Sequence, residues 1–241
     1  MADKNIYLYQ TQSLYNRMYN ERHAQRALNR AKTYIKGAFS RINLTIDIEI
    51  RSKTPNPPQE YYKDVSGPVP CGSISSDWSW LNGWFRDWLA CKSLQPGHDE
   101  FDDVSVLLSN TDETSGGLAF ARCMHAQTGY WVSQLPSSYQ KAGNGKAHAA
   151  MSTVLHELGH AFMENTDPKY EHNVGKTDRT SSSSTKYQTT PMGVIKGKDE
   201  NECGVPHYYD KGTDTGADDV LFRHIWSSCC LDEWSPYAYQ K

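Results

Sequence analysis

Apolar side chains follow a strand-like period near the start of the chain and a helical period directly after it. Residues 5–10 form a short β run, and residues 43–50 place apolar side chains at every second position, so both predict strands. Between them, residues 13–42 repeat apolar side chains three and four positions apart, which predicts one long helix. Strand, helix and strand in this order are typical of the opening of an α/β sheet.

The middle of the chain alternates irregular and strongly apolar stretches. Residues 53–75 carry several prolines and little periodicity, which predicts a surface loop. Residues 76–94 are dense in tryptophan and begin at a Ser-Ser-Asp cap, which predicts a helix. Its aromatic side chains are expected to pack in the core, and a role as a hydrophobic wall for a substrate side chain stays open. Apolar runs at 103–109, 116–122 and 130–135 predict three more strands.

The last third of the chain holds one clear amphipathic segment. Residues 147–163 keep a helical pattern whose apolar stripe would bury one side of the helix. Residues 167–190 are polar and serine-rich, which predicts a loop, and residues 217–230 predict a closing helix. No internal repeat is present, so we expect one domain over residues 1–241.

Composition narrows the classes of partner. The net charge of -3 supplies no basic field for phosphate backbones, so nucleic acid is not expected as a partner. No run approaches the roughly 18 apolar residues of a membrane span, so we expect no membrane-spanning helix. We also expect the protein to be a monomer. The six cysteines form no Cys-x-x-Cys pair, which favours disulfides in a secreted, extracellular protein over a metal site built from cysteines. Buried free thiols in a cytosolic protein are the alternative.

The predicted helix at 147–163 contains the sequence His-Glu-x-x-His at His156, Glu157 and His160. A helical residue advances about 100°, so His156 and His160 return to nearly the same face and can bind one metal ion together. The carboxylate of Glu157 can take a proton from a water on that metal and pass it to a leaving amine. These residues predict a zinc (Zn2+) peptidase that acts on a protein or peptide substrate. A chance match on an ordinary helix is the alternative, and the amphipathic context disfavours it.

The order of these elements resembles the metzincin clan of zinc metallopeptidases. A Gly-Leu-Ala-Phe strand precedes His-Glu-x-x-His-Ala-Phe, and a lone methionine follows in a loop flanked by proline and glycine. The resemblance implies a twisted mixed sheet with a long backing helix, an active-site helix, a Met-turn and a C-terminal helix. It further implies an upper lobe at about residues 1–162 and a smaller lower lobe at about 163–241, beneath the cleft.

The resemblance also assigns roles outside the helix. Gly117, Leu118 and Ala119 would lie at the sheet edge, where free N–H and C=O groups pair with an extended substrate. An ordinary core strand is the alternative for them. Met192 would be the Met-turn residue, an apolar floor beneath the histidine ligands, with gap filling as its alternative role. Val194 stands where the clan often has a tyrosine, which leaves the second oxyanion donor among His207, Tyr208 and Tyr209.

The third zinc ligand departs from the usual clan pattern. That pattern continues with a glycine, where this chain has Met163, and a third histidine, where it has Thr166. Asp167 follows one residue later, a spacing similar to the igalysin branch, and its carboxylate is the predicted third ligand. His172 and Asp178 lie further downstream as alternatives, and the Thr166 hydroxyl would bind zinc weakly.

Two other functions compete with the metzincin-like endopeptidase. The first is a zincin of the other large clan, in which a glutamate on a later helix, Glu200 or Glu202, completes the site. The second is a catalytically silent peptide-binding protein on the same fold, which the intact Glu157 disfavours. For the cysteines, the resemblance implies a bridge from Cys123 to Cys229 or Cys230, leaving Cys71 and Cys91 to join the tryptophan-rich helix to the loop before it.

Overall fold

A computed structural model gives the fold of the chain. It describes residues 4–17, 21–40, 42, 45–52, 54–61, 63–72, 74–94, 103–110, 117–120, 123–126, 129–162, 177–179, 187–192 and 220–226. All statements below concern these residues. They include the predicted active-site helix and the candidate Met-turn.

A five-stranded mixed sheet lies at the centre of the chain, in the order β2-β1-β5-β7-β6. Parallel pairing joins β2, β1, β5 and β7, whereas β6 at the edge pairs antiparallel with β7. The chain is therefore α/β, and the strands predicted at residues 5–10, 43–50, 103–109 and 116–122 are confirmed. The strands are β1 (Lys4–Gln10), β2 (Ile46–Ile50), β5 (Asp103–Leu108), β6 (Gly117–Phe120) and β7 (Cys123–Ala126).

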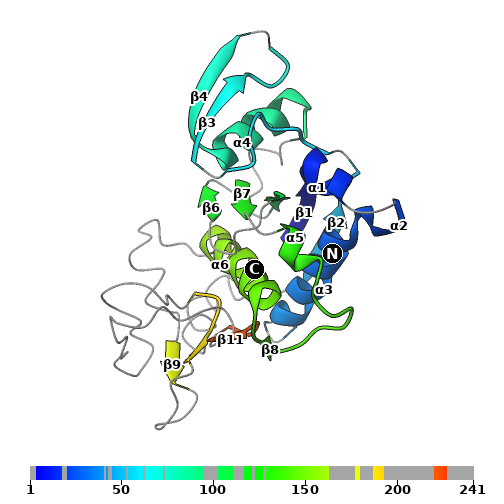
Figure 1. Cartoon of the computed structure of the whole chain (residues 1–241), viewed down its shortest axis with the longest axis vertical. Coiled ribbons are helices and arrows are strands. Elements are labelled where there is room, and N and C mark those ends of the chain that lie inside the picture. Colours follow the sequence, from blue (N-terminus) through cyan, green and yellow to red (C-terminus); the bar gives the residue numbers. More distant parts are fainter. Residues whose placement is uncertain are drawn as a thin grey trace.

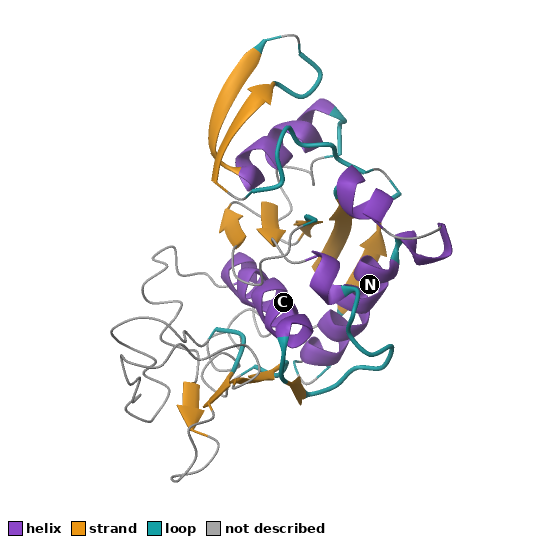
Figure 2. Cartoon of the chain, in the orientation of Figure 1, coloured by secondary structure: helices purple, strands orange, loops and turns teal. Residues whose placement is uncertain are grey.

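Helices cover both faces of this sheet (Figure 1, Figure 2). One face packs against α3 (Arg26–Phe39), the short α5 (Gly129–Val132) and α6 (Lys146–Phe162), and these elements share the main hydrophobic core. The opposite face packs against α4 (Leu81–Cys91) through a second apolar cluster. Strand residues alternate between the two faces, because successive side chains of a strand point in opposite directions. Both faces of β5 are therefore buried along its whole length.

The second cluster is built on the tryptophan-rich segment. Tyr9 of β1 meets Phe85 and Trp88 of α4 edge to face, with ring centroids 5.4 Å and 5.9 Å away. A hairpin of β3 (Lys63–Pro68) and β4 (Ser75–Trp80) leads into α4. The predicted packing role of these aromatic side chains is confirmed, since Trp84 and Trp88 are buried.

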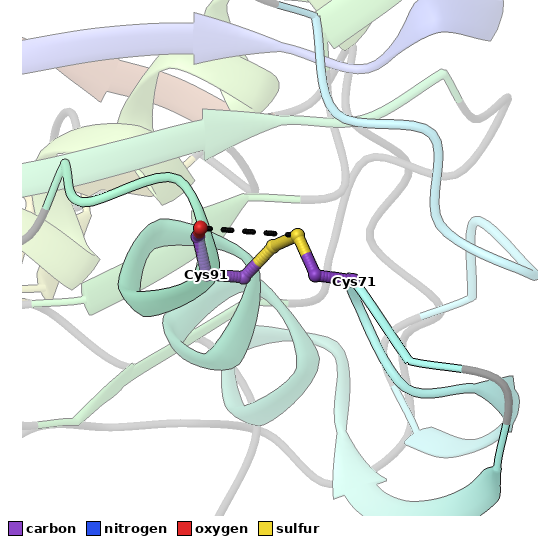
Figure 3. The surroundings of a disulfide bond; sticks show 2 residues. All are labelled: Cys71 and Cys91. Carbon is purple, nitrogen blue, oxygen red and sulfur yellow. Dashed lines mark hydrogen bonds between the residues drawn. A yellow bond between two sulfur atoms is a disulfide. The ribbon is translucent and has the colours of Figure 1, made fainter.

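Cys71, in the turn of this hairpin, is bonded to Cys91 at the end of α4 (Figure 3). The predicted bridge between these two cysteines is thus confirmed. Cys123, by contrast, is a free buried thiol in the second cluster, where burial raises its pKa to about 12. The predicted bridge from Cys123 to Cys229 or Cys230 is therefore wrong. Cys123 faces α4, whereas the chain just before those two cysteines lies in the main core on the other side of the sheet.

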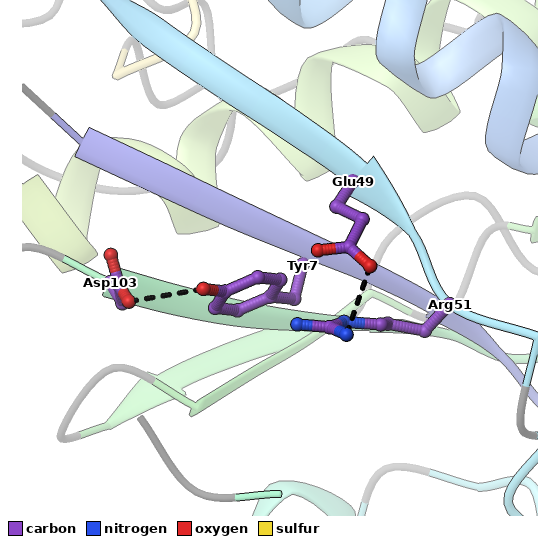
Figure 4. Close-up of polar contacts among 4 residues, drawn as sticks. All are labelled: Tyr7, Glu49, Arg51 and Asp103. Atoms are coloured by element: carbon purple, nitrogen blue, oxygen red, sulfur yellow. Dashed lines mark hydrogen bonds and ion pairs between the residues drawn. The ribbon is translucent and has the colours of Figure 1, made fainter. Parts of the chain in front are cut away.

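A polar network borders the α4 face of the sheet (Figure 4). The hydroxyl of Tyr7 donates to buried Asp103 at 3.2 Å, and the Asn5 amide donates to the same carboxylate at 2.8 Å. The Arg51 guanidinium lies 4.3 Å from the Tyr7 ring centre and 2.9 Å from the Glu49 carboxylate. Burial, followed by the charge of Asp103, raises the pKa of Tyr7. These contacts join β1, β2 and β5 across the sheet.

The proline-rich segment after β2 is anchored by one half-buried carboxylate. Glu60 accepts hydrogen bonds from the hydroxyls of Thr11 and Ser13 at 3.0 Å and 2.6 Å, and from the backbone N–H of Asn110 at 2.9 Å. Burial raises the pKa of Glu60, although all three hydrogen bonds favour its charged form. The segment is thereby held against the carboxyl ends of β1 and β5.

A smaller sheet lies below α6 in the view of Figure 1, with its strands in the order β8-β11-β10-β9. Its central strands β10 and β11 are parallel, and the two outer strands pair antiparallel with them. The division into two lobes stays a prediction, because most of residues 163–241 lie outside the described part. The strands are β8 (Ala142–Gly143), β9 (Thr177–Arg179), β10 (Tyr187–Thr189) and β11 (Val220–Arg223).

Several predicted elements differ from the observed ones in the first half of the chain. The long helix predicted at 13–42 is interrupted at Gln25, which lies outside helical geometry at φ -100 and ψ 12. The described helices there are α1 (Gln12–Arg17), α2 (Glu21–Ala24) and α3, and residues 18–20 lie outside the described part. A helical period survives such a break when successive helices bury the same face. The loop at 53–75 contains β3, and the helix predicted from residue 76 begins only after β4. Pairing with β3 determines that residues 75–80 form a strand, in which every second side chain is half-buried.

Other corrections concern the second half. The strand predicted at 130–135 is helix α5, since a short apolar run fits either state and Gly129 lets this one pack tightly on Leu14 and the Ser109 carbonyl. The loop predicted at 167–190 contains β9 and β10. The closing helix predicted at 217–230 is wrong over 220–223, which form β11 by pairing with β10 and β8.

The described helices fall short of the dimensions of a membrane span. None of them is long and apolar enough to cross a membrane.

A stacked histidine pair joins the smaller sheet to the start of α6. The rings of His148 and His224 are nearly parallel, with centroids 5.1 Å apart, and the Tyr34 ring stands 5.0 Å from His224. The two ring nitrogens of His224 face the carbonyl oxygens of Gln140 at 3.0 Å and His148 at 3.3 Å. Burial lowers the pKa of His148 to about 4, with the neighbouring His224 lowering it further, and burial also lowers the pKa of His224.

This pair predicts a loss of stability in acid. Both folded-state pKa values lie below the ordinary value, so the stability is complete above about pH 6.5 and is lost as the pH falls towards about 4. His148→Phe keeps a ring but cannot be protonated. It should reduce the drop in unfolding free energy between pH 7 and pH 4.5 by about 2 kcal/mol, as measured by urea unfolding. His23→Phe, outside the pair, serves as the control, and an equal reduction there would contradict the assignment.

Candidate zinc centre

Helix α6 carries the His-Glu-x-x-His sequence, and its position follows from its apolar face. The predicted helix is confirmed at Lys146–Phe162. It packs against β6, β7, α3 and α5 on one side of the central sheet. The fully buried side chains of this face are Ala150, Met151, Val154, Leu155 and Leu158. These contacts fix the rotation of the helix and therefore the direction of its histidines.

The two histidines of the motif converge on one point. His156 and His160 are half-buried, and their Nε2 atoms lie 3.1 Å apart. Their rings stand nearly perpendicular, at 84°, with centroids separated by 4.7 Å. Because the residues are one helical turn apart, their side chains share a face without any bend of the backbone. That both histidines bind one ion stays a prediction.

A backbone carbonyl sets the tautomer of the first histidine. The Nδ1 atom of His156 lies 2.8 Å from the carbonyl oxygen of Pro191. A carbonyl oxygen can only accept a hydrogen bond, so Nδ1 carries the proton and donates it. In the neutral ring, Nε2 then presents a lone pair towards His160. A hydrogen bond of this kind orients histidine ligands in metal sites.

The segment after β10 also supplies the floor of the site. Met192 is fully buried in the main core, in a turn that directly follows Pro191. Its sulfur occupies the space where a Cβ on Gly159 would lie, and the Trp226 ring is 3.3 Å from that same position. Gly159 lies directly before His160. The helix surface between the two histidines therefore rests on Met192 and Trp226.

Glu157 stands beside His156 on the same helix and is 6 % exposed. Burying a carboxylate to this extent costs free energy unless it is hydrogen-bonded or lies next to a positive charge. Its neighbours in sequence and on the helix are the residues predicted to bind metal. This placement suits a general base that works next to an ion.

β6 is the last strand of the central sheet in the described part of the chain, and α6 packs beside it (Figure 1). Within that part, Gly117, Leu118 and Ala119 pair with β7. An edge strand can offer backbone N–H and C=O groups to an extended peptide. The role of these three residues in substrate binding stays a prediction.

The spacing of the donor atoms suits zinc. Two nitrogens bound to one tetrahedral zinc at about 2.0–2.1 Å each are about 3.4 Å apart, and the two Nε2 atoms are 3.1 Å apart here. Among the described residues, no cluster of three or more histidine, cysteine, aspartate or glutamate side chains forms a complete metal site. Asp167, the predicted third ligand, lies outside the described residues. The two histidines thus fit zinc but do not complete its coordination.

The other predicted site residues divide in the same way. Asp178, an alternative ligand, belongs to β9, where it pairs with Gln188 of β10. Thr166, His172, both candidate glutamates and all three candidate oxyanion donors lie outside the described residues. Met192 lies against Gly159 of α6, and its role as a Met-turn stays a prediction.

Three residues that shape the candidate zinc centre were not predicted from the sequence. The Pro191 carbonyl could not be found, because a backbone oxygen has no signature in the sequence. Trp226 was placed in a helix of its own and not beneath α6. Gly159 did carry a signal, since a glycine inside a helix costs stability and therefore indicates a close approach of another segment.

The contact beneath α6 predicts an asymmetry between two helical glycines. Gly159→Ala should lower the unfolding free energy by about 1–3 kcal/mol and weaken zinc binding, because the new methyl group overlaps the Met192 sulfur. Gly83→Ala in α4 is the control, since the nearest atom to its new Cβ is 3.4 Å away. That change should be neutral or stabilising, by up to about 1 kcal/mol. Thermal melts and zinc titration compare the two, and equal effects would contradict this packing.

No known family model matches this chain, and no curated protein is significantly similar to it in sequence. The inference of function consequently rests on the chain's own geometry, above all on the two converging histidines of α6.

Proposed function

We propose that this protein is a zinc-dependent endopeptidase with a metzincin-like site. The observation that carries the proposal is the convergence of the His156 and His160 Nε2 atoms, with Nδ1 of His156 held by the Pro191 carbonyl. An isolated chance match to His-Glu-x-x-His has no need of a fixed tautomer or of an apolar floor beneath the helix. In the proposal, zinc is held by His156, His160 and Asp167.

The chemistry follows from the residue types. Zinc, when bound, would polarise the scissile carbonyl and lower the pKa of the attacking water. Glu157 takes the proton of that water as general base and delivers it to the leaving amine as general acid. Its low exposure keeps bulk water from competing for this proton. The hydrogen bond to Pro191 holds the first imidazole in the orientation that the ion requires.

Substrate binding is assigned to the edge of the central sheet. A peptide that pairs with the outer edge of β6, the last strand of the sheet among the described residues, would lie extended beside α6, with its scissile bond near the histidines. The acceptor and donor groups come from the backbone of Gly117, Leu118 and Ala119. Backbone pairing recognises a polypeptide whatever its sequence, which fits an endopeptidase.

The disulfide bears on where the protein works. Cys71 is exposed and Cys91 half-buried, and a bridge between such residues persists only in an oxidising compartment. We place the enzyme outside the cell on this ground and propose that it acts as a monomer.

The role of Glu157 is tested by a change that keeps the metal ligands. Glu157→Gln should retain about one zinc per chain and lose peptide hydrolysis by a factor of at least about 10²–10⁴, the usual contribution of a general base. Glu49→Gln, an exposed carboxylate on β2, is the matched control and should keep full activity. Zinc is measured by atomic emission, and hydrolysis with a quenched peptide library, with and without a chelator. Normal turnover in Glu157→Gln would refute the mechanism, and zinc-free but folded protein would refute the metal site.

The third ligand is tested separately by zinc affinity. Asp167→Ala should weaken zinc binding by orders of magnitude, because a catalytic zinc needs three protein ligands. Thr166→Val and His172→Ala are the controls and should bind as the parent does. If His172→Ala empties the site while Asp167→Ala leaves it filled, His172 is the third ligand and the assignment of Asp167 from the igalysin-like spacing is wrong. Loss of zinc only in Glu200→Ala or Glu202→Ala would favour the glutamate-ligand clan.

A further inference from the structure

A cavity of about 980 Å³ lies beside α4, on the face of the central sheet opposite α6. Three segments line it: the loop at 52–58, the turn at 68–71 and the side of α4. Glu60 anchors the first of these segments, and the Cys71–Cys91 disulfide joins the other two (Figure 3). Its walls are therefore fixed before any ligand arrives, and its volume falls within the usual range for small-molecule sites, about 300–1,000 Å³.

The walls differ in chemistry. Rings of Trp84, Trp88, Pro57 and Pro58 contribute to an apolar side. Hydroxyl and amide groups of the loop, such as those of exposed Ser52 and Asn56, contribute to a polar side. A sugar ring has the same two-sided character, because its C–H groups form an apolar face and its hydroxyls project from the rim. From this match we propose that the cavity is a binding site for an acidic oligosaccharide.

Charge specifies the acidic class. Among the described residues that line the cavity, Lys92 is the one that carries a charge, and no carboxylate accompanies it. Lys92 caps the end of α4 and is exposed at the border of the cavity. A carboxylate on the sugar would meet this ammonium group, whereas a cationic ligand would be repelled.

A polypeptide fits these walls less well. Backbone carbonyls of a bound peptide need N–H donors, and Pro57, Pro58, Pro68 and Pro70 of the lining have none. Sugar hydroxyls can themselves donate, so prolines on the wall cost them less. The oligosaccharide is accordingly favoured over a proline-rich segment of another protein.

The test measures binding directly and does not depend on peptidase activity. The full chain is titrated with 3′-sialyllactose and with lactose, with binding followed by saturation-transfer NMR. Saturable binding of both sugars is expected, with the acidic one bound up to about fivefold more tightly, the range of an exposed ion pair. Lys92→Ala should remove this preference, and Asn56→Ala should weaken both sugars. Both residues are exposed, so neither change should disturb folding, and Lys36→Ala on α3 is the control lysine.

Other outcomes would overturn the site. Absence of saturable binding for both sugars refutes it, and so does binding that neither Lys92→Ala nor Asn56→Ala alters. Binding of a proline-rich decapeptide in place of the sugars would assign the cavity to a polypeptide partner instead. Peptide hydrolysis should be unchanged in Lys92→Ala, because the cavity lies across the sheet from α6. Failure of the sugar site would therefore leave the proposed peptidase function untouched.

Discussion

The contact between α6 and the segment after β10 is the interaction on which the candidate site depends. Met192 fills the space left by Gly159, and the neighbouring Pro191 carbonyl holds His156. One short turn thus supplies both an apolar floor and a hydrogen-bond acceptor to the same helix. A helix alone can present two histidines, but only a second segment beneath it can fix their direction and tautomer.

The central sheet then separates two regions with different chemistry. On the α6 face, a continuous core supports the histidine pair, and β6 is the last described strand of the sheet beside it. On the α4 face, aromatic side chains pack on Tyr9, and a disulfide closes the walls of a large cavity. β5 is buried on both faces and lies between the two regions.

Long, strongly patterned elements were determined by the sequence itself. The apolar stripe of residues 147–163 decided both the existence of α6 and the common face of its histidines, since a 3.6-residue period leaves no other arrangement. The buried run at 103–109 was equally unambiguous, because only a strand covered on both faces is apolar throughout. The candidate catalytic residues lie on α6, and for this reason the spacing of residues along the chain was enough to identify them.

Pairing between distant segments was decided only by the tertiary structure. The strands β4 and β11 carry patterns that also suit helices, and their partners β3 and β10 settled the outcome. Cys123 was assigned to a bridge, yet the side of the strand on which it lies placed it against α4 as a free thiol. The Pro191 carbonyl likewise acts through position alone. Spacing along the chain reports which residues share a helix face, whereas hydrogen bonds between remote backbones leave no periodic trace in the sequence.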